Sequence, residues 1–279
     1  MFLHFRQTWV IIPTAFTESG GIKMKLNKEQ QMELADCLLN MGQLLLDCGA
    51  EISRVEETIS RMGVAYGATH VEVFVITSII SLSLEFPDEE PVTDTRRIYS
   101  SKGTDFYRLE KLNELSRLCC TTEVDLEELR EKLMRITKGR KPAVSILLGS
   151  VLASGGFAVF FGGTVWDGLA AAVFALGICL LQSRLEGTRI NVAGENLLIS
   201  LLTGLCVGLL CKFLPGLHMD QILMGDIMLL IPGLAMTNAV RNMLVGNTIS
   251  GIVRLTESLI WATALAGGFM TAILIVDLL

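Results

Sequence analysis

Polar residues inside an apolar stretch near the end of the chain are the first candidates for chemistry. Residues 225–251 are apolar enough to enter a bilayer, yet they include one carboxylate, one guanidinium and three amides: Asp226, Arg241, Asn238, Asn242 and Asn247. Pro232-Gly233 interrupts the same stretch. Proline removes a backbone donor and clashes with the preceding turn, so the sequence predicts a kink or a break there. Backbone groups freed at membrane depth persist only where protein or a water-filled cavity receives them.

A broken helix beside a carboxylate is how secondary transporters build a substrate site. We therefore interpret this stretch as one wall of a transport path, with Asp226 taking a proton or an ammonium group as the break opens and closes. Simpler interpretations stay open. Asp226 is then an interfacial carboxylate among headgroups, and Arg241 and Arg254 are positive-inside anchors. Glu257 then forms a helix ion pair with Arg254, three residues earlier.

Motifs for other chemistries are missing from the sequence. It contains no ATP-binding GxxxxGK[ST] loop and neither a GxSxG nor an HExxH motif. The seven cysteines form no CxxC pair, so they predict neither a disulfide framework nor a zinc site. The net charge of −6 argues against a nucleic-acid partner. We expect no enzymatic activity, no cofactor and no metal.

Two rival functions remain open. The first is a membrane-anchored enzyme whose chemistry lies in the N-terminal part, with Glu51, Arg54, Glu56 and Cys48 as candidates. The sequence shows no convincing pair of a nucleophile and a base there. The second is a membrane scaffold without transport, in which Asp226 and Pro232 would not affect efflux.

Charged residues divide the chain at Pro142. Only 12 of the 138 residues from Pro142 onward are charged, whereas the preceding residues carry the other 40 charges. Hydrophobic residues make up 51% of the chain and the mean hydropathy is +0.52, which is high for a soluble protein. The sequence therefore predicts a water-facing domain at residues 24–141 and a transmembrane domain at residues 142–279.

Residues 1–23 fit neither part. Their apolar run, residues 9–16, is broken by Pro13, is too short to span a bilayer and lacks a clear small-residue cleavage site. Met24 opens a segment that is typical of a natural start. We expect residues 1–23 to be a disordered leader or the product of an upstream start codon.

The water-facing part is predicted to be a small α+β domain. Its first helix begins after Asn27, a suitable N-cap, and ends at Gly49, a suitable C-cap. Alternating apolar residues within 71–86 predict strands. Asp125 with Glu128 predicts a capping box on the last helix. The expected elements are helices at about 28–48, 52–65, 105–119 and 126–136, strands at about 71–75, 79–86 and 93–100, and a turn at 87–91.

The apolar part is predicted to form five transmembrane helices. They lie at about residues 143–161, 168–185, 196–214, 221–240 and 255–276. Each approaches the roughly 20 residues needed to cross the hydrocarbon. Small residues recur four apart, a spacing that lets helices pack closely: Ser150 and Ser154, Gly204 and Gly208, Ala262 and Ala266. Asp167 and Asp277 lie near span ends and are predicted to be interfacial.

Basic residues in the loops predict the orientation. Most of them fall on one side of the five spans, and only Lys212 falls on the other. The basic side holds Lys138, Arg140, Lys141, Arg184, Arg189, Arg241 and Arg254. We therefore expect a multi-pass protein of the cytoplasmic membrane with a cytoplasmic N-terminal domain and an external C-terminus.

Two stretches resemble motifs of the threonine/serine exporter family. In the N-terminal part, Gly49-Ala50-Glu51-Ile52-Ser53-Arg54-Val55-Glu56-Glu57-Thr58 resembles the family signature G-A-x-x-x-R-V-E-x-T. In the apolar part, Ile231-Pro232-Gly233, Arg241, Gly251, Arg254 and Glu257 resemble its I-P-G…R…G…R-x-x-E block. The resemblance extends from about Met24 to the C-terminus, and the two motifs occur in the family order.

The resemblance implies a cytoplasmic domain and about ten membrane spans, on one chain or split over two. This chain resembles the first component of the split form, which implies a small all-membrane partner subunit; a homo-oligomer is the other assembly considered. The implied activity is export of threonine or serine, and the alternative is a dicarboxylate such as succinate.

The resemblance also bears on individual residues. The family often has an acid at the positions of Asn242 and Asn247, so Asp226 becomes the better candidate for proton coupling. In the N-terminal motif, Gly49, Arg54 and Glu56 are the expected functional positions. We expect Arg54 and Glu56 to brace the domain on itself, and the alternative is that they gate the cytoplasmic mouth.

Overall fold

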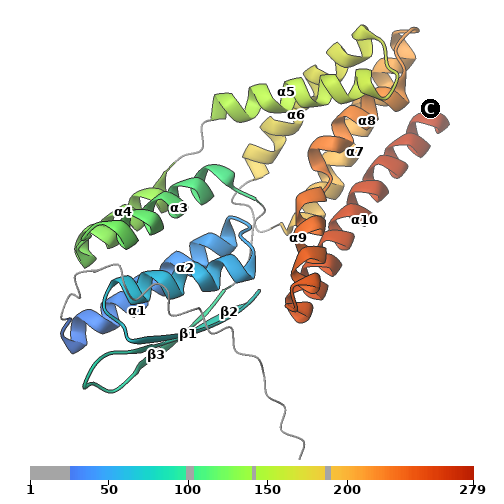
Figure 1. Ribbon diagram of the computed structural model, residues 1–279. Helices are drawn as coiled ribbons and strands as arrows, with labels where there is room; N and C mark the ends of the chain where they lie inside the picture. Colours follow the sequence, from blue (N-terminus) through green and yellow to red (C-terminus); the bar gives the residue numbers. More distant parts are fainter. Residues whose placement is uncertain (1–25, 99–103, 140–142, 186–189) are drawn as a thin grey trace, which may run out of the picture.

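The chain forms a domain of helices and strands followed by a bundle of helices (Figure 1). The computed structural model describes residues 26–98, 104–139, 143–185 and 190–279. The predicted leader, residues 1–23, lies outside the described residues. The domain comprises the described residues up to 139, and the bundle comprises those from 143 onward.

The N-terminal domain has the predicted order of elements. Two helices precede three strands, and two helices follow them: α1 (Lys28–Asp47), α2 (Ile52–Ala65), β1 (His70–Ile76), β2 (Ile79–Glu85), β3 (Val92–Arg97), α3 (Phe106–Thr121) and α4 (Leu126–Lys138). The strands form an antiparallel sheet in the order β1-β2-β3. Strand β3 ends at Arg97, before the predicted end at Ser100, and residues 99–103 lie outside the described residues.

The domain core lies between the sheet and the first two helices. Ile80, Leu82 and Leu84 alternate along β2, and all three are fully buried. Helices α1 and α2 pack on this face, and α3 and α4 form a third layer beyond them (Figure 1). Hydroxyl groups occupy the opposite face of β2, where Ser81 pairs with Thr95 at 3.2 Å. The strand pattern of the sequence therefore encodes one buried face and one polar face.

Capping explains where the first helices begin and end. Asn27 and Gln30 form a reciprocal capping box at the start of α1. At its end, Gly49 has a φ of +83°, and the Ala50 N–H donates to the Leu45 carbonyl at 2.9 Å, as in a Schellman motif. The predicted capping box of α4 is wrong. Asp125 occupies the N-cap but makes no side-chain hydrogen bond to the helix, and Glu128 pairs with Lys132 at 2.8 Å instead.

The bundle consists of apolar helices. Its elements are α5 (Ala143–Phe160), α6 (Val165–Leu185), α7 (Val192–Phe213), α8 (Met219–Leu230), α9 (Gly233–Leu244) and α10 (Thr248–Leu278). Within the described residues, α6, α7 and α10 are long and apolar enough to cross a membrane, and the bent pair α8–α9 makes a fourth span if it counts as one. Helix α5 is apolar but shorter. The chain is a helical membrane protein, and the predicted fifth span depends on α5.

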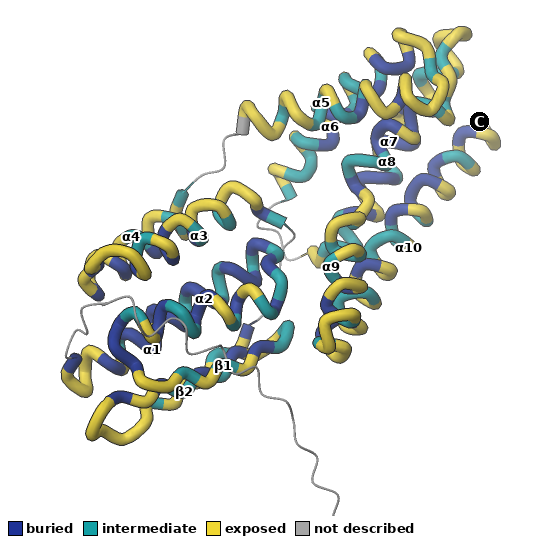
Figure 2. The backbone as a smooth tube through the Cα atoms, in the orientation of Figure 1, coloured by how far each residue is buried: buried dark blue, intermediate teal, exposed yellow. Residues whose placement is uncertain are grey.

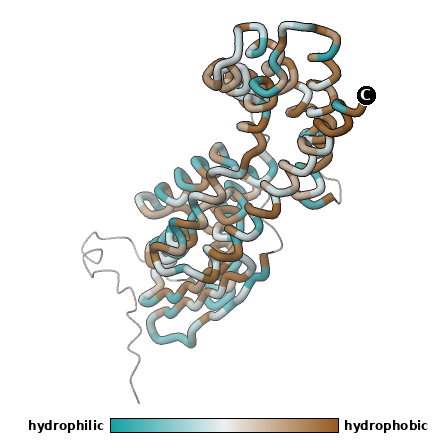
Figure 3. Tube along the Cα trace, turned by 90° about the vertical axis from the view of Figure 1, so that its right-hand side faces the viewer, coloured by the Kyte–Doolittle hydropathy of each residue, from teal (hydrophilic) through white to brown (hydrophobic). Residues whose placement is uncertain are grey.

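Apolar side chains cover the outside of the bundle. Figure 3 shows hydrophobic residues along its helices, and Figure 2 shows that many of them are exposed. Trp166, Leu152 and Leu274 are examples, each with more than half of its surface accessible. A surface of this kind is compatible with lipid or with a further apolar helix, and not with bulk water.

Small residues set several helix contacts, including those at the predicted pair Gly204 and Gly208. Helix α10 packs on α7, where a Cβ atom at Gly208 would lie 2.6 Å from Val276. Gly155 of α5 and Gly168 of α6 face each other in the same way, since a Cβ at Gly155 would lie 2.9 Å from the Gly168 carbonyl oxygen. Glycine is required at these contacts because a Cβ would overlap the Val276 side chain at Gly208 and the backbone of α6 at Gly155.

Candidate functional site

The predicted break lies at Pro232, where α8 and α9 meet at a bend of 50°. Pro232 has φ −79° and ψ 48°, and the Gly233 N–H donates to the Ile231 carbonyl at 2.8 Å across a tight turn. None of the described backbone hydrogen bonds joins the Leu229 and Leu230 carbonyls to the first amides of α9. Among the described residues, the break therefore leaves main-chain groups of two apolar helices without main-chain partners.

Asp226 lies on α8, six residues before Pro232, and its side chain is fully buried. The Ser154 hydroxyl on α5 donates to Asp226 Oδ1 at 2.7 Å. The other carboxyl oxygen, Oδ2, has no hydrogen-bond partner among the described residues. Close approach of the helices encloses the group, since a Cβ at Gly225 would lie 2.5 Å from the Ser154 carbonyl oxygen.

This environment limits what Asp226 can do. A buried carboxylate with only one hydrogen-bond partner is costly to keep ionised, so such groups are paired, neutralised or reached by water. The alternative of an interfacial carboxylate among headgroups does not fit, because the side chain is enclosed between helices. The arrangement suits a group that exchanges a proton when water gains access.

An apolar groove of about 440 Å³ lies beside the break, between α8 and α10. Ile227 and Ile231 line one side, and Ala266 and Phe269 line the other. Ala262 also lines the groove. The predicted tight contact at Ala262 and Ala266 is therefore not made within the described residues, because no helix of this chain covers that face.

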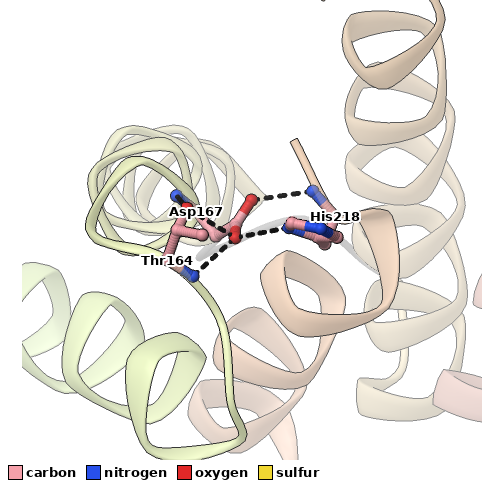
Figure 4. A network of polar contacts seen from close by, with 3 residues as sticks. All are labelled: Thr164, Asp167 and His218. Carbon is pink, nitrogen blue, oxygen red and sulfur yellow. Dashed lines mark hydrogen bonds and ion pairs between the residues drawn. The ribbon is translucent and has the colours of Figure 1, made fainter. Parts of the chain in front are cut away.

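A second buried carboxylate holds the loop before α8 (Figure 4). Asp167, at the start of α6, accepts the His218 backbone N–H at 2.7 Å and lies 2.9 Å from His218 Nδ1. It also accepts the Thr164 backbone N–H at 2.7 Å and the Thr164 hydroxyl at 2.8 Å. The Asp167 side chain is fully buried and hydrogen-bonded near the end of its span, and its interfacial depth stays a prediction. Asp277, by contrast, is exposed near the end of α10.

Replacing Asp167 with asparagine is expected to destabilise the bundle by about 1–2 kcal/mol. The asparagine amide has one accepting oxygen instead of two, so some of the donors that now bind Asp167 would lose their hydrogen-bond partner. Asp277→Asn is the matched control, since Asp277 is exposed. Thermal denaturation of the purified protein in detergent, followed by circular dichroism, measures the difference. Equal denaturation temperatures for the two variants would contradict a structural role for the Asp167 network.

Arg241 lies in the last turn of α9 and pairs with Glu51 of the N-terminal domain. The distance between Arg241 Nη1 and Glu51 Oε1 is 2.6 Å. Arg241 also lines an open cavity of about 410 Å³, together with Thr237 on α9 and Leu255 on α10. The two stretches that carry the sequence motifs thus meet at this pair, although 190 residues separate them.

The other predicted residues of the bundle follow the break. Asn242 on α9 is buried, and its Nδ2 has no hydrogen-bond partner among the described residues. The main-chain carbonyl of Asn242 accepts the Asn247 backbone N–H at 2.9 Å. Asn238 and Arg254 are half-buried and Glu257 is exposed. No direct hydrogen bond or contact ion pair between described residues joins Arg254 to Glu257, although the Glu257 charge still acts on Arg254 from a greater distance.

The predicted residues therefore occupy two places rather than one. Asp226 contacts α5 on one side of the break, and Arg241 contacts the N-terminal domain on the other. No hydrogen bond or ion pair between described residues connects them. Nor do the described residues gather three His, Cys, Asp or Glu side chains that could hold a metal ion.

Two residues of the N-terminal motif, Gly49 and Glu56, shape the domain itself. Glu56 accepts the Val75 backbone N–H at 3.2 Å and so ties α2 to β1. Burial raises the pKa of the Glu56 carboxyl, and the hydrogen bond from Val75 partly offsets this rise. Arg54 is exposed and pairs with Glu57 at 3.5 Å on the same helix. Gly49 provides the left-handed turn before α2. This arrangement favours bracing by Glu56.

Sequence patterns did not reveal three of the partners. Ser154 stood out only as a small packing residue, His218 did not stand out, and Glu51 was a candidate only in the rival enzyme and within the N-terminal motif. Their partners lie 72, 51 and 190 residues away along the chain. Spacing within a helix cannot predict such contacts.

Comparison with known proteins is consistent with a transporter. A family model described as "Putative threonine/serine exporter" matches residues 36–276. Two relatives, from Klebsiella aerogenes and Escherichia coli, are each named "Probable succinate transporter subunit YjjP". Each is 25% identical to this chain, and each match covers 86% of this chain and 91% of the relative.

A longer relative also matches. A protein from Mycobacterium tuberculosis named "Probable threonine/serine exporter" is 23% identical over 262 residues, which make up 91% of this chain but only 48% of that protein. No solved structure matches the chain. Since the family model spans most of its length, the chain belongs to the threonine/serine exporter family of transporters.

Proposed function

We propose that this chain is one subunit of a secondary transporter that exports a threonine- or serine-type amino acid across the cytoplasmic membrane. The observation that carries the proposal is the broken α8–α9 helix with a fully buried carboxyl group, Asp226, just before the break. A discontinuous helix with an enclosed titratable group is how transporters place a substrate or coupling-ion site within the membrane.

The path would run along the break. At 1.5 Å per helical residue, Asp226 lies roughly 9 Å before Pro232 along the axis of α8, and Arg241 lies roughly 13 Å beyond it along α9. In this proposal Asp226 exchanges the coupling proton, while Arg241 meets the carboxylate of the substrate on the side of the N-terminal domain. Asn238 and Asn242 lie on α9, Arg254 and Glu257 lie in the first half of α10, and Gly233 begins α9 directly after Pro232.

The orientation and the partner belong to the same proposal. The basic loops favour a cytoplasmic N-terminal domain, five spans and an external C-terminus. Two relatives are named as transporter subunits, and a longer relative continues well beyond the matched region. We therefore expect a second, all-membrane chain, with one of its apolar helices covering the groove of about 440 Å³ beside the break. Assembly with further copies of this chain is the alternative.

A dicarboxylate is the second candidate substrate. The relatives named as succinate transporter subunits match along 91% of their length, whereas the relative named as a threonine/serine exporter matches along 48%. Both substrate classes carry a carboxylate, so Arg241 suits either. The rival enzyme gains no support from the site, because the described N-terminal residues pair structurally and family membership favours transport.

Efflux from loaded cells tests the proposal. Cells without their own exporters are loaded with labelled threonine or succinate and express this chain, the proposed all-membrane partner, both, or neither. We expect faster release of one substrate only when both chains are present. Equal release of both substrates in all four strains would refute the proposed function.

A further inference from the structure

Among the described residues, a single ion pair links the N-terminal domain to the bundle. Glu51 Oε1 accepts from Arg241 Nη1 at 2.6 Å. No other hydrogen bond or ion pair between described residues joins the domain to the bundle. An isolated contact of this kind can open without disturbing either core.

The side chain of Glu51 makes its contact outside its own helix. Glu51 is the N-cap residue of α2, yet its side chain makes no capping hydrogen bond. Gly49 sets the turn before it through a φ of +83°, and the neighbouring Ile52 is fully buried. The backbone at Glu51 is therefore fixed, and its carboxylate is used outside the domain rather than within it.

Arg241 has unused N–H donors among the described hydrogen bonds and borders a cavity, so it can bind another ligand. The described hydrogen bonds use only Nη1 of its guanidinium, which can bind a carboxylate through two parallel N–H groups. The Arg241 side chain is 61% exposed, whereas that of Glu51 is 19% exposed. The cavity of about 410 Å³ that Arg241 lines is within the size range of small-molecule sites.

We propose that Glu51 occupies the place of a substrate carboxylate on Arg241, so that the N-terminal domain closes the entrance to the path with a built-in competitor. The inference rests on the proposed function. Export then requires the substrate carboxylate to displace Glu51, which frees the domain from α9. Amino acids and dicarboxylates share this group, so both are expected to compete in the same way.

The strength of the pair fits such an exchange. An ion pair between partly exposed side chains changes the equilibrium constant between the paired and unpaired states by a factor of about five or less, because water screens the charges. A contact of this strength holds the entrance closed when substrate is scarce and yields when substrate accumulates. A fully buried pair would be too costly to break, since it would leave an unpaired charge.

Transport by the reconstituted complex of both chains tests the inference. The KM for threonine and for succinate is measured on the side of the N-terminal domain. Glu51→Gln keeps the shape of the side chain but removes its charge, so we expect the KM of the transported substrate to fall two- to fivefold, the range that an exposed ion pair allows. Glu57→Gln, a substitution on the same helix that breaks ion pairs only within the domain, is expected to leave the KM unchanged.

The Glu51→Gln substitution in an Arg241→Gln variant tests whether Glu51 competes with the substrate for Arg241 or only attaches the domain to the bundle. In an Arg241→Gln variant, a further Glu51→Gln substitution is expected to have no effect on the KM. An unchanged or higher KM for Glu51→Gln alone, or an equal fall in both backgrounds, would overturn the inference while leaving the proposed function intact. If the wild-type complex transports neither substrate, the proposed function fails and the inference fails with it.

Discussion

Replacing Asp226 with asparagine is expected to lower proton-driven efflux by roughly tenfold or more, the effect of losing at least 1.4 kcal/mol in the coupled step. Asparagine has nearly the same size, and its amide oxygen can still accept the Ser154 hydroxyl, which now lies 2.7 Å from Asp226 Oδ1. The amide cannot release a proton, however. Efflux driven by an imposed pH gradient in proteoliposomes measures the loss.

Two comparisons make this result specific. Asp220→Asn is the same substitution on the same helix, at an exposed residue in the first turn of α8, and is expected to leave efflux unchanged. Exchange of labelled for unlabelled substrate needs no net proton movement, so Asp226→Asn is expected to retain it. Full pH-driven efflux by Asp226→Asn would show that Asp226 does not carry the proton.

Replacing Gly268 with alanine is expected to be among the most destabilising changes in the bundle. A Cβ at Gly268 would meet Ser200 Oγ, would lie 2.6 Å from the Leu197 carbonyl oxygen and would lie 3.0 Å from the Leu201 nitrogen. The Ser200 side chain can rotate, but the backbone of α7 cannot yield locally, so α7 and α10 must separate. We expect a loss of roughly 3 kcal/mol or more, at or above the usual cost of overpacking a core.

The adjacent glycine provides the control. A Cβ at Gly267 would meet only Leu197 Cδ1, at 3.8 Å, which is an ordinary contact. Gly267→Ala is therefore expected to leave the bundle as stable or slightly more stable, because alanine favours helix over glycine. Thermal denaturation and the monodisperse yield in detergent compare the two variants. Equal stability would mean that α7 and α10 lie farther apart than described.

The sequence predicted the features that depend on local chemistry. Pro232 marks the break because proline lacks the donor that a continuous helix requires, and the structure bends there by 50°. Asn27 and Gly49 mark the ends of α1 because one caps amides and the other adopts a positive φ. The alternation in β2 predicted its buried face for the same local reason, since side chains alternate across a strand.

Local patterns were less informative where several partners compete. Asp125 met the sequence rule for a capping box, but Glu128 pairs with Lys132 instead. Arg254 and Glu257 have the spacing of a helix ion pair, yet the described residues form no direct contact ion pair between them. Partly exposed side chains such as those of Glu128 and Lys132 gain little from any one partner, so spacing alone does not determine which pair forms on α4.

Taken alone, the sequence determined the membrane character of the chain, the order of the N-terminal elements, the family motifs and the position of the break. Only the tertiary structure decided which polar groups meet: Ser154 with Asp226, His218 with Asp167, and Glu51 with Arg241. The reason is physical. An apolar helix in lipid carries hydrophobic residues on every side, so its sequence does not show which face turns inward. Helix packing fixes that rotation, and it depends on close contacts between residues far apart in the chain.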